Sequence, residues 1–448
     1  HRLAWQRFSS DQIIRYHAAM VALLREHSEG QFVTHNFIPA SDTAAVNSDL
    51  ASPLDFPSYD SYPLGRTDLL LQHRLAHEEF ARYQRTGHPD LNALTLDQTR
   101  GLGPGGFWIM EQQPGPVNWA KANPAPAPGM IRLWVYEAFA HGADCVSFFR
   151  WRQAPFAQEQ MHAGLLRRDD EPSRRWPEIA TTIAEIEALK LADVPTQTAR
   201  VALLVDAESE WITNIERQSD AYSLPDVQFD AYRALRSFGL SVDFVEAHTN
   251  FEQYDLVVVP CLAVIGDDFV ARARRSEATF LFGPRSGSKT TEFQIPATLA
   301  PGALGDWLDA RVVEVETLRP AHPLRVEWGG TEYDAHCWHE WLESSSADIL
   351  ATCEDGSPAL LRKGRACYLT TLPDTAWWTA LVEFLCEELG IHGQRLPDTL
   401  RLRQRGPLTF ALNYGDTPCQ VPHPDSAEWI LGGPDLAPRD VAVWRTTP

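Results

Sequence analysis

The stretch GGFWIMEQQPGPVNW (Gly105–Trp119) places a carboxylate at the end of a run of apolar residues. Residues 107–110 (FWIM) predict a short, fully buried strand of the kind found inside a parallel sheet. Glu111 follows this strand, and the loop beyond it carries Trp119. Loops at that rim of a (β/α)8 barrel build the active site, so a glutamate there indicates a chemical role. A helix-capping or salt-bridged carboxylate is the alternative, and the motif alone leaves both open.

Strands and helices alternate outward from this stretch over about the first 192 residues. Further strands are predicted at 30–38 (GQFVTHNFI), 58–65 (SYDSYPLG) and 145–152 (CVSFFRWR), and helices at 67–85, 130–142 and 173–190. A first helix is expected to open at Ser9, which has Gln12 at capping-box spacing. Its predicted apolar face consists of Ile13, Ile14, Met20, Val21 and Leu24. Four strand–helix units, with polar and aromatic residues after every strand, predict half of a (β/α)8 barrel.

The two later segments have different patterns. Apolar strands at 199–206, 240–247, 254–260 and 278–283 alternate with helical stretches, which predicts a flavodoxin-like or amidotransferase-like α/β domain over 193–391. Short strands and turns from 392 to 448 predict a small antiparallel, β-sandwich-like module. The predicted fold class is therefore α/β, with a partial (β/α)8 TIM barrel over 1–192 followed by these two domains.

The composition restricts the partners of the chain. Sixty acidic residues against 39 basic ones give a net charge of −21, which argues against nucleic acid and anionic membranes. Fifteen tryptophans suit stacking on sugar rings, although tryptophan also fills large cores. The seven cysteines include no C-x-x-C pair, so they are expected to be small buried side chains in a reducing, cytoplasmic compartment. We predict no cofactor and no metal.

Two motifs in the α/β segment resemble functional sites and are set aside. GPRSGSKT (Gly283–Thr290) is similar to a phosphate loop, but Ser288 separates the glycine from the lysine and no helix is predicted after it. Cys261 follows a strand, as amidotransferase nucleophiles do. Its surroundings, PCLAVIG, lack the small flanking glycines that a nucleophile elbow needs.

A second polar pair lies in the predicted half-barrel. Glu159 and His162, in FAQEQMHAGLL, are three residues apart, so a short helix or turn would place them on one side. From this spacing alone, a solvated polar loop is the favoured interpretation.

Longer motifs connect these residues to a known family. FWIMEQQPGPVNW, PGMIRLWVYEAFAHGADCVSFFRWR and EQMHAGLL closely resemble the β-galactosidases of glycoside hydrolase family 42, as do LDFPSYDSYP and RFSSDQIIRYHAAM. The resemblance covers essentially the whole chain, and the α/β segment resembles the trimerisation domain of the family. It implies a homotrimer and a (β/α)8 barrel that hydrolyses terminal, non-reducing β-D-galactosides with retention. It also implies that Glu111 is the nucleophile and that Tyr62, Trp119, Glu159 and His162 bind the galactose.

One departure from the family concerns the acid/base residue. In this family that glutamate follows an asparagine at the end of the fourth strand, and no Asn-Glu pair occurs in the sequence. Asn36 is followed by Phe37 and does not match the motif. The chain is therefore expected to be the C-terminal portion of such an enzyme, without the metal-binding cysteines of the family and inactive alone. The alternatives are a non-catalytic sugar-binding remnant, a subunit completed by a separate N-terminal chain, and an α-L-arabinopyranosidase.

Overall fold

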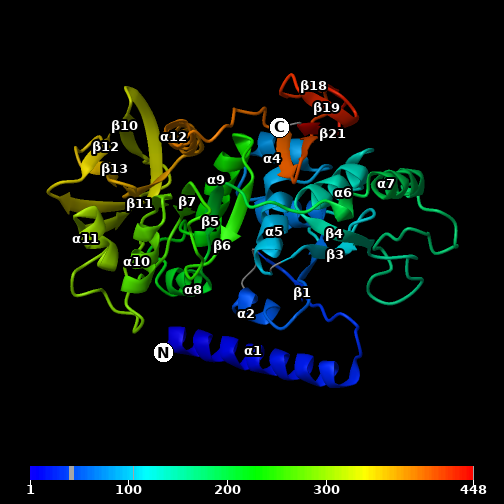
Figure 1. Ribbon diagram of the computed structural model, residues 1–448, viewed down its shortest axis with the longest axis horizontal. Helices are drawn as coiled ribbons and strands as arrows, with labels where there is room; N and C mark the ends of the chain where they lie inside the picture. The colour runs from blue at the N-terminus through cyan, green and yellow to red at the C-terminus, as the bar shows by residue number, and fades with distance from the viewer. Residues whose placement is uncertain (40–44, 104, 447–448) are drawn as a thin grey trace. The chain divides into compact units, whose positions relative to one another are not determined.

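The computed structural model describes residues 1–39, 45–103 and 105–446 (Figure 1). The chain divides into two compact units. One contains residues 1–13 and 198–395, and the other contains residues 14–197 and 396–448. We call the first the α/β unit and the second the barrel unit. No helix in the described part of the chain is long and apolar enough to cross a membrane.

A four-stranded parallel sheet forms the centre of the barrel unit. Its strands lie in the order β1 (Asn36–Phe37), β2 (Ser58–Ser61), β3 (Phe107–Gln112) and β4 (Ala143–Phe148). Asp60 on β2 lies opposite Glu111 on β3 in the register. The four predicted strands are present, although the one predicted at 30–38 forms a ladder over only two residues. Phe107 and Ile109 are fully buried, but Trp108 and Met110 are only half-buried, so the prediction of a strand buried along its whole length is wrong.

The helices of the barrel unit differ from the prediction in two places. The structure has α2 (Asn47–Ala51), α3 (Pro63–Leu71), α4 (His77–Tyr83), α5 (Pro89–Gly101), α6 (Met130–Ala140), α7 (Trp176–Leu189) and the 3-10 turn η1 (Leu191–Asp193). A single helix over 67–85 is wrong, because the backbone is extended at Ala76 (φ −57°, ψ 148°) and separates α3 from α4. The prediction missed α5, whose buried positions include the polar residues Asp90, Asn92 and Asp97 and so show little apolar periodicity.

The helix α6 carries most of the apolar core of the barrel unit. Ile131, Leu133 and Trp134 are fully buried. They form one cluster with Phe410 and Val443 of the C-terminal strands. Each such side chain contributes roughly 1.5–3 kcal/mol when it is removed from water. Figure 1 shows α5 and α6 beside the sheet, and both contact its strands.

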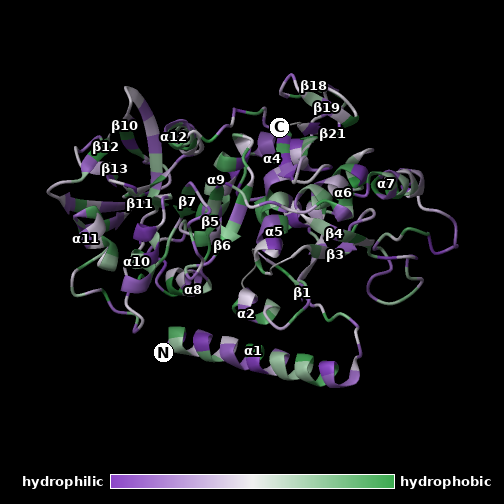
Figure 2. Ribbon diagram, in the orientation of Figure 1, coloured by the Kyte–Doolittle hydropathy of each residue, from purple (hydrophilic) through white to green (hydrophobic). Residues whose placement is uncertain are grey.

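The first helix, α1 (Arg2–His27), begins earlier than predicted. The proposed capping box at Ser9 therefore lies inside the helix and caps nothing. The predicted apolar face of this helix is not buried as a whole. Val21 is 5% exposed, but Ile13, Met20 and Leu24 are 40–46% exposed. Figure 2 shows apolar and polar residues alternating along this helix.

The α/β unit combines a parallel sheet with an antiparallel extension. The parallel strands β5 (Val201–Leu204), β6 (Val242–Val245), β7 (Leu256–Val259) and β8 (Thr279–Phe282) are buried along their whole length, as predicted. The helices and turns of this unit are α8 (Ala207–Ile215), α9 (Leu224–Ser237), α10 (Asp267–Arg275), η2 (Gly302–Leu304), α11 (Gly305–Leu308) and α12 (Thr375–Glu388).

The antiparallel extension was not predicted. It consists of β9 (Ala310–Thr317), β10 (Leu324–Trp328), β11 (Thr331–Ser344), β12 (Asp348–Cys353), β13 (Pro358–Lys363), β14 (Ala366–Leu369) and β15 (Thr371–Pro373). Strand β14 joins it to the parallel part, because β14 pairs parallel with β8 and antiparallel with β13.

The C-terminal module is the predicted antiparallel sheet. Its strands lie in the order β16 (Leu400–Arg405), β17 (Leu408–Asn413), β21 (Asp440–Thr446) and β19 (Ala427–Leu431), and β18 (Cys419–Gln420) pairs with β20 (Asp435–Leu436).

Alternate residues of β16 are buried arginines. Arg401 makes two hydrogen bonds of 2.6 Å to Asp90, and Arg403 lies 3.1 Å from Asp97. Arg405 donates to the carbonyls of Phe139 and Ala143. We call Arg401, Arg403 and Arg405 the arginine row. It joins the module to the helices of the barrel unit.

Candidate active site

Glu111 lies at the C-terminal end of β3 and accepts a hydrogen bond from a tyrosine. The hydroxyl of Tyr62 donates to Glu111 Oε2 at 2.5 Å. Tyr62 immediately precedes α3, with Pro63 at the first helical position. Proline fixes its own φ and suits the first turn of a helix, so this turn places Tyr62 at the end of β2. Two neighbouring strand ends therefore hold the glutamate and its donor side by side.

The ring of Tyr62 also contacts two of the other predicted residues. Its centroid lies 5.5 Å from that of Trp119 and 5.7 Å from that of His162, and both pairs meet edge to face. Trp119 is 43% exposed, so part of its ring is open to a ligand. Gly65 makes room for it, because a Cβ at Gly65 would lie 2.4 Å from the Trp119 ring.

Glu159 and His162 lie in the loop after β4. The backbone N–H of His162 donates to the carbonyl of Glu159 at 3.1 Å. Arg150 donates to both the carbonyl and the carboxylate of Glu159 at 3.0 Å. His162 is 1% exposed, and its buried Nε2 has no hydrogen-bond partner among the described residues. This nitrogen is available to a ligand hydroxyl. A simple solvated loop does not account for such a histidine.

The structure thus places Glu111, Trp119 and His162 against Tyr62, and Glu159 next to His162. It also adds Asp60, which the sequence analysis passed over. Asn36 Nδ2 donates to both oxygens of Asp60, at 2.8 and 3.1 Å. Ser58 Oγ in turn donates to Asn36 Oδ1 at 2.8 Å. The signal in the sequence is weak, because only the register of β2 with β3 brings Asp60 opposite Glu111.

Burial dominates the electrostatics of this group. Burial, and secondly the charge of Glu111, raise the pKa of Asp60 from 3.8 to about 6. Burial and the hydrogen bond to Glu111 raise the pKa of Tyr62 well above its ordinary value, so its hydroxyl remains a donor. Burial lowers the pKa of His162, which favours the neutral ring. The site therefore combines a protonated tyrosine and a neutral histidine with carboxylates.

The two motifs that were set aside have no catalytic features in the structure. Cys261 is 1% exposed, and burial raises the pKa of its thiol to about 12, which excludes a reactive thiolate. The residues after Gly283–Thr290 are described up to the turn η2, and no α-helix begins among them. All seven cysteines are described, and each is a free thiol.

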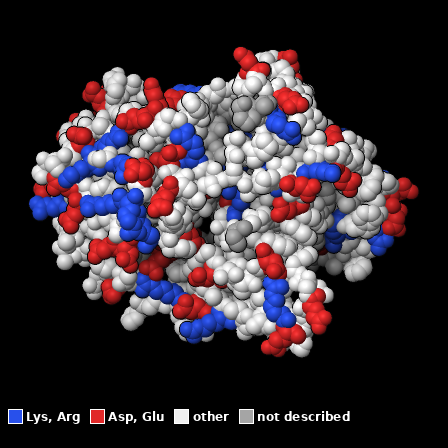
Figure 3. Space-filling model, in the orientation of Figure 1, with Lys and Arg blue, Asp and Glu red and all other residues white. Residues whose placement is uncertain are grey.

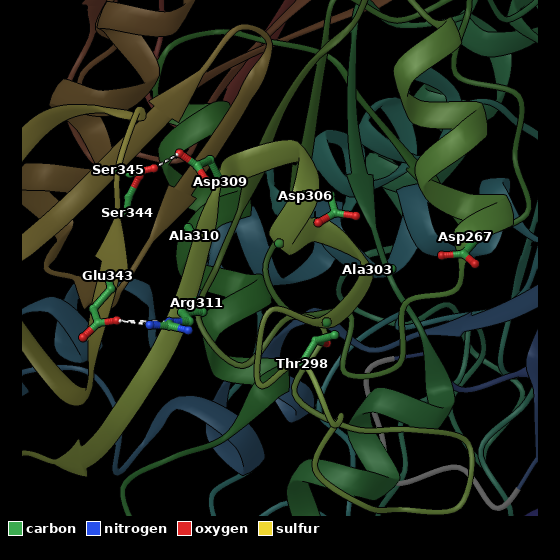
Figure 4. Close-up of a pocket in the computed structure, with 12 residues that line it drawn as sticks. Asp267, Thr298, Ala303, Asp306, Asp309, Ala310, Arg311, Glu343, Ser344 and Ser345 are labelled. Carbon is green, nitrogen blue, oxygen red and sulfur yellow. Dashed lines mark hydrogen bonds and ion pairs between the residues drawn. The ribbon is translucent and has the colours of Figure 1, made fainter.

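A cavity of about 760 Å³ lies in the α/β unit (Figure 4). Four of the twelve residues that line it are acidic, namely Asp267, Asp306, Asp309 and Glu343. Its Arg311 is paired with Glu343 at 2.8 Å. None of the five predicted site residues lines it. On the face of the molecule in Figure 3, acidic and basic side chains are interspersed.

Three protein-family models match the chain. A model described as β-galactosidase matches residues 1–189, one described as the β-galactosidase trimerisation domain matches residues 199–392, and one described as the β-galactosidase C-terminal domain matches residues 399–446.

Similar proteins include β-galactosidases from bacteria and archaea. The chain is 46% identical to the β-galactosidase BgaA of a Thermus species, over 99% of this chain and 68% of that protein. It is 35% identical to the β-galactosidase BgaH of Haloferax lucentense, over 98% of this chain and 67% of that protein. Among solved structures, the β-galactosidase from the psychrophilic Marinomonas ef1 superposes with a TM-score of 0.95 at 39% identity, over 100% of this chain and 69% of that one.

Proposed function

Since the chain belongs to the glycoside hydrolase family 42 β-galactosidases, we propose that it acts on terminal, non-reducing β-D-galactosyl residues with retention of configuration. The observation that carries the proposal is the 2.5 Å hydrogen bond between Tyr62 and Glu111 at adjacent strand ends. In this proposal Glu111 is the nucleophile, and Tyr62, Trp119, Glu159 and His162 form the galactose subsite.

The chemistry assigns each side chain a task. Glu111 attacks the anomeric carbon and forms a glycosyl ester, which water then hydrolyses. The hydrogen bond from the Tyr62 hydroxyl holds the Glu111 side chain in one orientation. The open part of the Trp119 ring suits the C–H face of a sugar. The free Nε2 of His162 and the carboxylate of Glu159 bind hydroxyls, and they disfavour an epimer that leaves them unpaired.

Retention also requires a second carboxyl group, about 5–5.5 Å from the first, as general acid and base. The family's Asn-Glu pair does not occur in these 448 residues. The chain also spans 68% of the length of its Thermus relative. We therefore expect these residues alone to turn over no nitrophenyl β-galactoside. Turnover by the chain alone would contradict this and would assign the acid role to a carboxyl described here, with Asp60 the first to test.

A covalent probe tests the nucleophile without the acid. A dinitrophenyl 2-deoxy-2-fluoro-β-galactoside has a leaving group that needs no protonation, and its fluorine slows hydrolysis of the ester. We expect mass spectrometry of the digested chain to find one fluorogalactosyl group, on the peptide that contains Glu111. Glu111→Gln should stay unlabelled, whereas Glu159→Gln should still be labelled, but more slowly. Labelling of Asp60 or of Glu159 in the wild type would overturn the assignment.

Two further questions are which sugar the protein prefers and whether it is catalytic at all. They are tested by comparing two nitrophenyl glycosides and by comparing binding with turnover. An α-L-arabinopyranoside resembles the galactoside without the hydroxymethyl group. The chain mixed with the N-terminal portion of the Thermus relative, which this chain does not match, should release nitrophenol faster from the galactoside than from the arabinopyranoside. Faster release from the arabinopyranoside would establish the alternative sugar. Tight galactose binding without probe labelling or turnover in the complemented protein would establish the non-catalytic alternative.

For the remaining segments, we propose a catalytic half-barrel over 1–192, a trimerisation domain over 193–391 and a small β domain over 392–448. The middle segment matches a trimerisation model, and its buried Cys261 offers no catalytic alternative. We therefore propose a homotrimer. Light scattering should give three times the mass of the chain at every protein concentration above the dissociation constant of the trimer. A monomer mass at every concentration would contradict it. The seven free thiols support a cytoplasmic location.

A further inference from the structure

Three side chains of metal-binding type meet at one end of the antiparallel extension. The ligand atoms of His339, Cys353 and Asp355 all lie within 4.8 Å of one another. His339 lies on β11, directly at a register shift, while Cys353 ends β12 and Asp355 lies in the turn to β13. These residues belong to the α/β unit, whereas the residues around Glu111 belong to the barrel unit.

The turn that carries Cys353 and Asp355 is well defined. The Cys353 N–H donates to the carbonyl of Ser357 at 2.8 Å, and the Gly356 N–H donates to the carbonyl of Cys353 at 2.9 Å. Gly356 has φ +84°, a conformation that glycine adopts without strain. The hairpin therefore holds its thiol and carboxylate two residues apart on a fixed backbone, close to the histidine on β11.

The histidine has unused binding capacity. His339 is fully buried, and its Nδ1 has no hydrogen-bond partner among the described residues. Its Nε2 lies 3.1 Å from Ser357 Oγ. Buried polar atoms are nearly always paired, so the unpaired Nδ1 of a histidine that lies in a cluster with a thiol and a carboxylate calls for an explanation.

A nucleophilic Ser-His-Asp triad does not fit these contacts. A triad needs the carboxylate on the histidine nitrogen remote from the serine. Here the hydroxyl of Ser357 itself donates to Asp355 Oδ1, at 2.5 Å, and the remote nitrogen is unpaired. Cys353 is no better as a nucleophile, because it is only 4% exposed.

We propose that His339, Cys353 and Asp355 bind a zinc-type divalent cation that fastens the β12–β13 hairpin to β11. Imidazole nitrogen, thiolate sulfur and carboxylate oxygen are the three ligand types that Zn²⁺ takes in proteins, at about 2.0–2.3 Å. Tetrahedral coordination at those lengths separates ligand atoms by roughly 3.3–3.7 Å, so ligand atoms within 4.8 Å of one another need only a small contraction on binding. Asp355 is exposed and gives the ion a path from solvent, and water or the Ser357 hydroxyl completes the coordination.

This site explains a limit of the sequence analysis, which predicted no metal because no C-x-x-C pair occurs. The ligands follow another spacing, C-x-D with a histidine 14 residues before the cysteine. Only the folding of the sheet brings them together, because β10 pairs with β11 on one side and with β12 on the other. The inference is independent of the proposed galactosidase activity.

Cobalt provides the test, because Co²⁺ replaces Zn²⁺ and absorbs visibly. We expect the chelator-treated chain to bind one Co²⁺, with a sulfur-to-cobalt charge-transfer band in the near ultraviolet that Zn²⁺ abolishes. Cys353→Ser should lose this band. Asp355→Asn alters an exposed side chain and is expected to keep the fold, but to weaken Co²⁺ binding at least about 10-fold. Cys367→Ser is the matched control, since Cys367 is an equally buried thiol in the same unit but outside the cluster.

Three results would overturn the proposal: no charge-transfer band in the wild type, a band that survives Cys353→Ser, or unchanged affinity in Asp355→Asn. Circular dichroism identifies a variant that fails to fold. If Cys353→Ser fails to fold, the test rests on the other two variants. Asp355→Asn should then bind Co²⁺ more weakly than the wild type, and Cys367→Ser should keep the charge-transfer band.

Discussion

Replacing Asp60 with asparagine should change how the stability of the barrel unit depends on pH. The pKa of Asp60 in the folded protein is about 6, raised from 3.8 by burial and then by Glu111. A carboxyl whose pKa rises on folding binds its proton more tightly when folded. The wild type therefore loses stability as the pH rises from about 3.8 to about 6, and loses no more above that range. Asp60→Asn cannot ionise and escapes this loss.

The magnitude follows from the pKa change. For a fully buried group, a rise from 3.8 to about 6 corresponds to about 3 kcal/mol. Asp60 is only half-buried, so solvent screening reduces this to about 1 kcal/mol. Asn36 donates to both oxygens of Asp60, and an amide can accept only one of these bonds. The lost hydrogen bond lowers the unfolding free energy of Asp60→Asn by the same amount at every pH. The informative quantity is therefore how the difference in unfolding free energy between the two proteins changes with pH.

The assay is urea unfolding of both proteins from about pH 4 to about pH 7, with hydrogen exchange of β2 and β3 peptides to assign the transition to the barrel unit. Asp55→Asn is the control of opposite sign. The Val33 N–H and then Arg25 lower the pKa of Asp55, so its contribution is present at neutral pH and is lost as the pH falls. An Asp60→Asn advantage that stays constant or shrinks with rising pH would refute the reasoning.

Three further changes test other parts of the barrel unit. Glu111→Gly in the chain complemented by an N-terminal half should be inactive with water but form the α-galactosyl azide with azide, and a β-azide would contradict the nucleophile assignment. Gly65→Ala should weaken galactose binding measured by titration calorimetry, because its Cβ would lie 2.4 Å from the Trp119 ring; unchanged affinity would show that this ring does not bind sugar. Arg401→Met should cost about 3–5 kcal/mol in urea unfolding, because it leaves the buried Asp90 without its bidentate partner. The double variant with Asp90→Asn should recover part of that loss, and additive losses would argue against the pairing.

The sequence predicted the parts of the site that follow strand ends. A buried apolar run followed by a polar residue identified Glu111, and the Tyr62-Pro63 turn identified the end of β2. Side-chain period and turn chemistry act over a few residues, so they can be read locally. The pairing of Asp60 with Glu111 depends on the register between strands about 50 positions apart, and no local pattern encodes it.

The missed elements have a similar explanation. Helix α5 packs buried polar residues such as Asp97 against partners distant in sequence, so its apolar period is weak. Strand β11 continues for 14 residues from Thr331 to Ser344, with exposed and buried positions in irregular alternation. Its register shifts twice against its neighbours, and such bulges interrupt the period of two that identifies a strand.

The arginine row also affects how the protein is made on the ribosome. Asp90 is synthesised 311 residues before Arg401. At elongation rates of about 5–20 residues per second, that interval is roughly 15–60 s. During that time the nascent barrel segment carries the Asp90 carboxylate, whose ion-pair partner Arg401 has not yet been synthesised. The pairing of helix α5 with Arg401 therefore forms only after β16 has left the ribosomal tunnel.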